Sequence, residues 1–223
     1  MRVLIGAVLA ALAVSAATAR APAQMPSVPV CESHQAGLGG VGRAETVSFT
    51  GAVGRERVCA LVANLSAGAV SARIIDGARG GDALVVAAIT PGGGAVLGVR
   101  DGALAVEAAP PGTRQGGDSV AIGPFVVPPG GGFPSADAHD SEQVRVALAY
   151  AGSRLVLIQT TPVTIVDLAL ALRNQPDLFG IDAPERAVLL ASGSGAVLQL
   201  HTDDGTLGTS PATPQALELT KRP

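Results

Sequence analysis

Two places in the sequence carry side chains that could hold a small ligand. Arg145 begins an apolar, β-like stretch, and its planar guanidinium can bind a phosphate or carboxylate through two parallel hydrogen bonds. The loop at 191–195 reads Ala-Ser-Gly-Ser-Gly, and the hydroxyls of Ser192 and Ser194 could donate to the same ligand. This loop has no carboxylate, His, Cys or Lys, and a serine nucleophile would need a base. These residues therefore indicate binding more than catalysis, although Arg145 could also be a plain arginine on the exposed face of a strand.

A strand pair and a helix must position Arg145. Apolar residues alternate along 144–150, which predicts a half-buried strand, and 155–158 is its expected hairpin partner. The helix is expected at 164–174, where Thr164 can cap the N-terminus and Asp167 stands at the reciprocal capping position. The serine loop is expected between two further short strands.

The upstream half of the chain also has the pattern of strands. A continuous apolar run at 84–89 predicts a strand buried on both faces, and the Asp-Gly pair at 101–102 predicts a hairpin turn. Long Gly/Pro loops follow at 109–118 and 128–141. The expected fold class is α+β, with a mixed, mostly antiparallel β-sheet core and one or two packed helices.

The order of these elements resembles that of the phosphodiester glycosidase family. The resemblance covers roughly residues 44–200 and rests on short motifs that follow one another in the same order. They are the strand at 86–89 with its Gly-rich continuation at 90–94 and the turn at 101–102, the Gly-Pro run at 122–127, the strands at 145–149 and 154–158, the helix motif at 167–172 and the loop at 190–196.

The polar positions of the family's motifs are mostly replaced here. The family's Asn-Gly-Gly-Phe-Phe falls on 90–94, where Thr90 stands in place of Asn. Its Leu-Asp-Gly-Gly-Gly-Ser-Ser loop falls on 190–196, where Ala191 stands in place of Asp. Arg145 matches the arginine that opens the family's Arg-Thr-Ala-Val-Gly strand. The resemblance therefore implies substrate contacts from Thr90, Gly92, Arg145, Ser192, Gly193 and Ser194.

Carboxylates and aromatic rings suited to sugar chemistry are scarce. Glycosidic hydrolysis usually needs two carboxyl groups, and nothing pairs Asp76, Asp82 or Asp118, which have the context of solvated turn residues. His139 lies in a Gly/Pro loop and is a weak metal candidate, so we expect no metal and no cofactor. The chain has no Trp and a single Tyr, which disfavours ring stacking on a sugar.

The termini predict export. Residues 1–19 have a basic start, an apolar run and a small-x-small end, which is the signal-peptide pattern. We expect a Pro/Ala/Gly-rich tail at 20–43, the phosphodiester-glycosidase-like domain at 44–205 and a C-terminal tail at 206–223. No segment of the mature chain is predicted to span a membrane. The formal net charge of −3 argues against a nucleic acid partner.

The chain has two cysteines, Cys31 and Cys59, so only one internal pairing is possible. In an oxidising periplasmic or extracellular compartment we expect a disulfide that ties the N-terminal segment to the first strands. The resulting hypothesis is an exported phosphodiester-glycosidase-like protein with weak or lost hydrolase activity toward sugar–phosphate diesters. Its partner would be a small sugar-phosphate or glycan ligand. The alternative is a non-catalytic periplasmic binding or interaction module.

Overall fold

Antiparallel β-strands make up most of the fold. The computed structural model describes residues 31–51, 56–76, 82–109, 118–132, 134 and 140–223, and the predicted signal peptide lies outside them. The described residues contain one α-helix, α1 (Ile165–Asn174), and short 3-10 helices η1 (Ala67–Ala69), η2 (Pro176–Phe179) and η3 (Gly193–Gly195). The predicted antiparallel sheet with a packed helix is confirmed, but the fold is predominantly β and not a balanced α+β arrangement.

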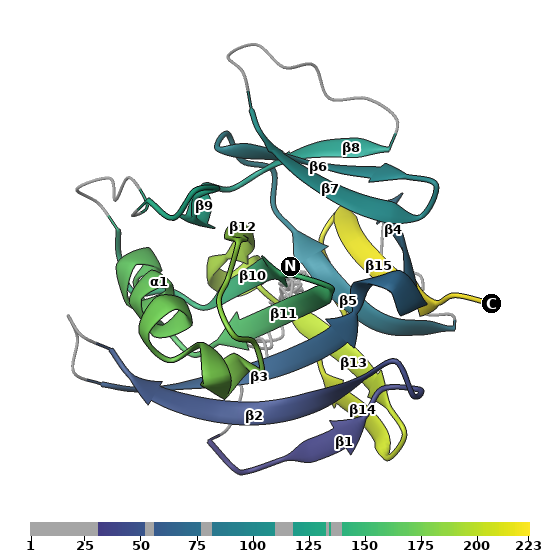
Figure 1. Cartoon of the computed structure of the whole chain (residues 1–223), viewed down its shortest axis with the longest axis horizontal. Coiled ribbons are helices and arrows are strands. Elements are labelled where there is room, and N and C mark those ends of the chain that lie inside the picture. Colours follow the sequence, from purple (N-terminus) through teal and green to yellow (C-terminus); the bar gives the residue numbers. More distant parts are fainter. Residues whose placement is uncertain (1–30, 52–55, 77–81, 110–117, 133, 135–139) are drawn as a thin grey trace, which may run out of the picture.

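The strands form three sheets in which every pairing is antiparallel. The largest has the order β1 (Gln35–Gly37), β2 (Gly42–Thr50), β3 (Arg57–Ser66), β11 (Arg154–Thr160), β10 (Arg145–Ala151), β12 (Arg186–Ser192) and β9 (Phe125–Val127). The second has the order β14 (Gly205–Gly208), β13 (Leu198–Thr202), β5 (Ala83–Ile89), β15 (Gln215–Lys221) and β4 (Val70–Asp76). The third has the order β7 (Ala103–Ala108), β6 (Ala95–Arg100) and β8 (Ser119–Ile122) and lies at the top of Figure 1.

The seven-stranded sheet is the middle layer of the fold. Val146 and Leu148 on β10 point into an apolar cluster shared with the five-stranded sheet. Ala147 and Ala149 point to the opposite face, where they pack in a second cluster with Leu168 and other residues of α1. Figure 1 shows α1 beside the β9 end of this sheet. Strand β10 is thus buried on both faces, and the prediction of a half-buried strand is wrong because alanine on one face makes room for the helix.

The predicted hairpins and helix cap agree with the structure. Strands β10 and β11 form an antiparallel hairpin, and β6 and β7 are joined through Asp101 and Gly102, whose φ values are 51° and 72°. Two consecutive positive φ angles fit a type I′ turn, which explains the Asp-Gly pair. Helix α1 begins as predicted, because the side chain of Thr164 accepts a hydrogen bond from the Asp167 amide at 3.0 Å.

Both predicted tails are partly ordered strand. Strand β15 pairs with β4 and β5 inside the five-stranded sheet, and its Leu217 and Leu219 are fully buried, so 206–223 is not a frayed tail. Two alternating leucines in a short segment are enough to bury one face of a strand. At the other end, β1 and the start of β2 fall within the predicted 20–43 tail, and Leu38 between them is fully buried.

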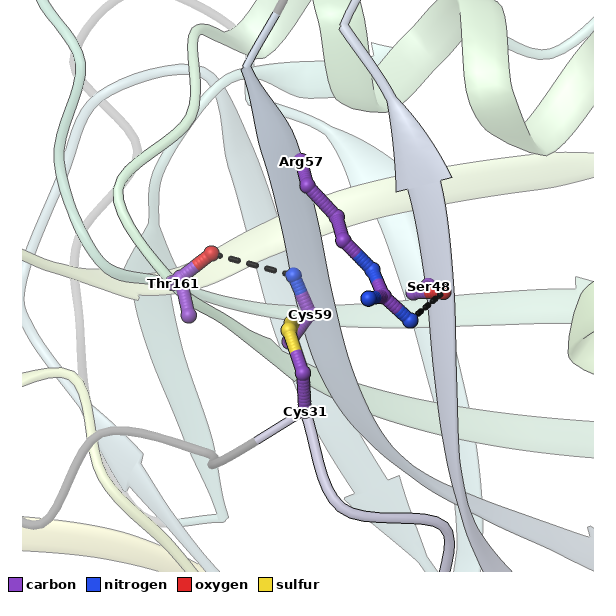
Figure 2. Close-up of a disulfide and its surroundings, with 5 residues drawn as sticks. All are labelled: Cys31, Ser48, Arg57, Cys59 and Thr161. Carbon is purple, nitrogen blue, oxygen red and sulfur yellow. Dashed lines mark hydrogen bonds between the residues drawn. A yellow bond between two sulfur atoms is a disulfide. The ribbon is translucent and has the colours of Figure 1, made fainter.

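The predicted disulfide between Cys31 and Cys59 is present, with a Cα–Cα distance of 5.3 Å. Figure 2 shows it joining the segment before β1 to β3, where Cys59 also donates its amide N–H to Thr161 Oγ1 at 3.1 Å. The bond therefore fastens the N-terminal segment to the middle layer. Within the described ranges, no helix is long and apolar enough to cross a membrane.

Candidate functional site

Four of the six predicted contact residues line one cleft. Thr90, Gly92, Arg145 and Ser192 surround a cavity of about 220 Å³. Thr90 follows β5, and its amide N–H donates to the Leu190 carbonyl at 2.8 Å, which joins the two motif loops. Arg145 opens β10 and Ser192 closes β12, so three separate strand ends meet here. Their role in substrate binding stays a prediction.

A β-bulge places Ser192 opposite Arg145. Ala147 pairs with Leu189, but Val146 pairs with Ala191, so Leu190 is an extra residue in β12. Without this insertion the register would bring Ala191 opposite Arg145. With it, Ser192 is the partner of Arg145, and the serine Oγ accepts a hydrogen bond from Nη1 at 2.9 Å.

The guanidinium of Arg145 is satisfied almost entirely from within the protein. Nε donates to the Val163 carbonyl at 3.2 Å, and Nη2 donates to the Ser141 carbonyl at 2.6 Å and to Asp140 Oδ1 at 2.8 Å. With the Ser192 contact, four of its five N–H groups are engaged. Only 5% of the residue is exposed, and burial lowers its pKa while the charge of Asp140 acts in the opposite direction. Arg145 is therefore not an arginine on an exposed strand face. Its buried guanidinium holds Asp140, Ser141, Val163 and Ser192 together, and this set of contacts is called the clamp below.

Asp140 is the polar residue of this site that the sequence did not reveal. Its side chain is 9% exposed, and its second oxygen, Oδ2, accepts from the amides of Ile165 at 2.6 Å and Val166 at 3.3 Å. The carboxylate thus bridges Arg145 and the N-terminus of α1, where a negative charge is stabilised. The sequence pattern placed Asp140 in the Gly/Pro loop at 128–141 and indicated no role for it. The available signal was an acidic residue closely preceding the arginine that opens a strand, and this signal is weak.

The remaining predicted residues lie outside the cleft. Gly193 turns the chain at the start of η3 with a φ of 72°, and its amide N–H donates to the Val144 carbonyl at 2.9 Å. Ser194 is exposed on this turn. Ala191, where the resemblance predicted a carboxylate, is 3% exposed and belongs to the apolar cluster between the two larger sheets. The cleft therefore presents an apolar methyl group at this position.

The cleft offers hydrogen-bonding groups but little reactive chemistry. Among the described residues that line it there is no Asp, Glu, His, Cys or Lys. Asp76, Asp82 and Asp118 are exposed and lie elsewhere. His139 lies outside the described residues. In the described part of the chain no three His, Cys, Asp or Glu side chains are grouped so as to hold a metal ion.

Comparison with solved structures identifies proteins of the same fold. The catalytic domain of zebrafish N-acetylglucosamine-1-phosphodiester alpha-N-acetylglucosaminidase, auto-inhibited by its pro-peptide, matches with a TM-score of 0.57 and 12% identity, over 86% of this chain and 88% of that domain. A hypothetical protein from Synechocystis matches with a TM-score of 0.53 and 11% identity, over 82% of this chain and 62% of that protein. The sequence matches no family model and, in a search of the curated proteins, no protein. These similarities show a shared fold and a distant structural relationship.

Proposed function

We propose that this is an exported phosphodiester-glycosidase-like protein whose hydrolase activity toward sugar–phosphate diesters is weak or absent. The fold shared with the zebrafish phosphodiester glucosaminidase supports the family assignment, together with the ordered motifs of the sequence. The disulfide between Cys31 and Cys59 supports export to the periplasm or the extracellular space, because such bonds persist in oxidising compartments.

The observation that supports the proposal is that the charged groups near the cleft, Asp140 and Arg145, are already engaged in hydrogen bonds within the protein. Hydrolysis of a glycosidic bond usually needs one carboxyl group as acid and a second as base or nucleophile. Asp140 is the carboxylate bonded to Arg145, and both of its oxygens already accept hydrogen bonds. The described residues leave one N–H of Arg145 for a ligand. Neither residue is free to take a catalytic role without breaking the clamp.

The alternative function is a binding module that holds a small sugar phosphate or glycan without cleaving it. The hydroxyls of Thr90 and Ser192 and the remaining Arg145 N–H would supply its polar contacts. Gly92 favours a close approach of the loop to its neighbour, since a Cβ there would lie 2.6 Å from the Ile122 carbonyl carbon. The size of the cavity, about 220 Å³, suits one sugar ring or one phosphate group better than a long chain.

The test combines hydrolysis and binding in one set of variants. The purified exported protein is incubated with a chromogenic aryl sugar phosphodiester, and we expect no release above that of buffer. In parallel, N-acetylglucosamine 1-phosphate is titrated into wild type, Ser192→Ala and the matched control Ser194→Ala, whose serine is exposed outside the cleft. If the wild type and Ser194→Ala hydrolyse the substrate and Ser192→Ala does not, the proposed loss of activity is contradicted. Binding with the same pattern, but without hydrolysis, would favour the binding module.

A further inference from the structure

A second hollow lies at the far end of the seven-stranded sheet. It has a volume of about 320 Å³ and is lined by Gly42, Arg43, Asn64, Arg154 and Gly180. Arg154 opens β11, whereas Thr160, which accepts a hydrogen bond from the Arg145 amide, ends it. At 3.3 Å per residue the two ends of this strand are roughly 20 Å apart. The hollow is therefore separate from the cleft at Arg145.

Strand register brings the polar side chains of the hollow to one face of the sheet. Asn64 on β3 pairs with Arg43 on β2 and with Val156 on β11. Arg154 precedes Val156 by two residues and so points to the same side. This face is the one covered by the segment of η2 and Gly180, whose carbonyls contact Asn64.

The side-chain amide of Asn64 is held in one orientation, and its oxygen accepts no hydrogen bond from the described residues. Nδ2 donates to the carbonyls of Phe179 at 3.0 Å and Gly180 at 2.8 Å. The opposite amide orientation would set Oδ1 against two carbonyl oxygens, so these contacts determine which atom is which. Asn64 is 3% exposed, and its Oδ1 has no hydrogen-bond partner among the described residues. Because a buried acceptor without a partner is unfavourable, Asn64 Oδ1 favours a ligand that can donate an N–H or O–H hydrogen bond to it.

Two guanidinium groups flank this amide. The Arg43 side chain is 49% exposed and lies 3.2 Å from Glu45, while Arg154 is exposed. Gly180 has a φ of 65°, and a Cβ at this position would come within 2.7 Å of Arg43 Nη2. The glycine thus leaves the space that the guanidinium occupies. Two arginines and one paired glutamate give the hollow an excess of positive charge.

We propose that this hollow binds a small phosphate that retains an O–H group. Arg43 and Arg154 bind the phosphate oxygens through charge-assisted hydrogen bonds, and the ligand O–H donates to Asn64 Oδ1. Solvent does not reach Oδ1 in this structure, so the ligand O–H reaches it only after a neighbouring group shifts. The ligand is either free phosphate or the monoanion of a phosphate monoester, since both carry a phosphate O–H.

The proposal is tested by NMR titration of the ¹⁵N-labelled protein, following the signals of the Asn64 side-chain amide and the Gly180 backbone amide. The pH is about 6, where phosphate keeps an O–H. Inorganic phosphate is expected to shift both signals to saturation, and sulfate, which matches its shape but has no O–H, to bind at least about fivefold more weakly. Glycerol phosphate separates the two sources. If it binds tighter than inorganic phosphate, the ligand is a phosphate monoester; if it binds more weakly, the ligand is free phosphate. Sodium chloride at equal ionic strength is the salt control.

Surface variants keep the test independent of folding. Arg43→Ala and Arg154→Ala should each raise the Kd for phosphate about tenfold. Glu45→Gln, which frees Arg43, should lower it. Arg57→Ala is the matched control, because Arg57 is an exposed arginine at the other end of β3. The proposal is overturned if phosphate produces no saturable shift, if sulfate binds equally well, or if the Arg43 and Arg154 variants bind phosphate like Arg57→Ala.

Discussion

Asp140 and Arg145 form a buried ion pair in which Oδ1 of the aspartate lies 2.8 Å from Nη2 of the arginine. The aspartate also accepts from the first amides of α1, and the arginine also donates to Ser192 on β12. One pair of side chains thus joins the loop before β10, the helix and two neighbouring strands. The charged groups beside the cleft therefore hold the fold together, and this use competes with any role in chemistry.

Removing the charge of Asp140 should destabilise the protein strongly. Asp140→Asn leaves the Arg145 guanidinium buried without its counter-ion, and breaking a buried pair from one side usually costs about 3 kcal/mol or more. The free energy of unfolding, measured by urea denaturation, is expected to fall by about that amount. Asp182→Asn, at an exposed aspartate, is the control and should change it by less than about 0.5 kcal/mol. Equal midpoints for the two variants would show that the clamp adds nothing to stability.

The parts of the fold that follow local rules could be predicted from the sequence. Thr164 caps α1 because a hydroxyl three residues before an amide can reach it, and Asp101-Gly102 adopts the positive φ angles of a tight hairpin. These features depend on a few adjacent residues. The meeting of Thr90, Arg145 and Ser192 at one cleft depends on tertiary structure, and only the resemblance to a family suggested it.

The misjudged features depend on contacts between distant segments. Strand β15 is a strand because Leu217 and Leu219 lie between β4 and β5, two partner strands that begin more than a hundred residues earlier. Asp140 is buried because Arg145 and the helix amides surround its carboxylate, although its neighbours in sequence are those of a solvated loop. Local composition contains neither piece of information.

Replacing the only tyrosine should stabilise the protein. The hydroxyl of Tyr150 is buried without a hydrogen-bond partner among the described residues, while its ring lies 5.7 Å from the guanidinium carbon of Arg186. Tyr150→Phe removes the unsatisfied hydroxyl and keeps the ring, so the free energy of unfolding is expected to rise by about 1 kcal/mol. Leu155→Ala, which empties part of the same core, serves as the reference for a loss of about 3 kcal/mol. A destabilised Tyr150→Phe protein would mean that the hydroxyl has a partner in solution.

The same tyrosine predicts a dependence of stability on alkaline pH. Burial raises the pKa of Tyr150 above its usual value, and the charge of Arg186 offsets this only in part. Because the folded pKa exceeds the unfolded one, this contribution to stability is complete below about pH 10 and is lost as the pH rises toward the folded pKa. Tyrosinate absorbance should therefore titrate at higher pH in the native protein than in denaturant, and the chain has no second tyrosine to obscure it. Coincident titrations would contradict the burial of this hydroxyl.

Reduction of the disulfide should weaken the fold without abolishing it. The bond between Cys31 and Cys59 closes a loop with a sequence separation of 28 residues, for which chain entropy gives ~3.5 kcal/mol. Thermal unfolding with and without a reductant measures the effect. A double variant, Cys31→Ser with Cys59→Ala, should unfold at the temperature of the reduced wild type and should not respond to reductant. A reductant-sensitive double variant would show that the reductant acts elsewhere.

Arg73 and Glu218 form a second charge pair whose two members differ in exposure. Glu218 on β15 is fully buried, whereas the Arg73 side chain on the edge strand β4 is 60% exposed and donates to both carboxylate oxygens at 2.9 and 2.8 Å. Arg73→Ala should therefore lower the free energy of unfolding by about 2 kcal/mol, because it leaves a carboxylate in the interior without a partner. Adding Glu218→Gln should recover most of that loss, since a neutral amide has a smaller desolvation penalty than an unpaired charge. Chemical denaturation of the wild type, both single variants and the double variant forms a thermodynamic cycle. Additive losses in this cycle would mean that the two side chains do not interact in solution.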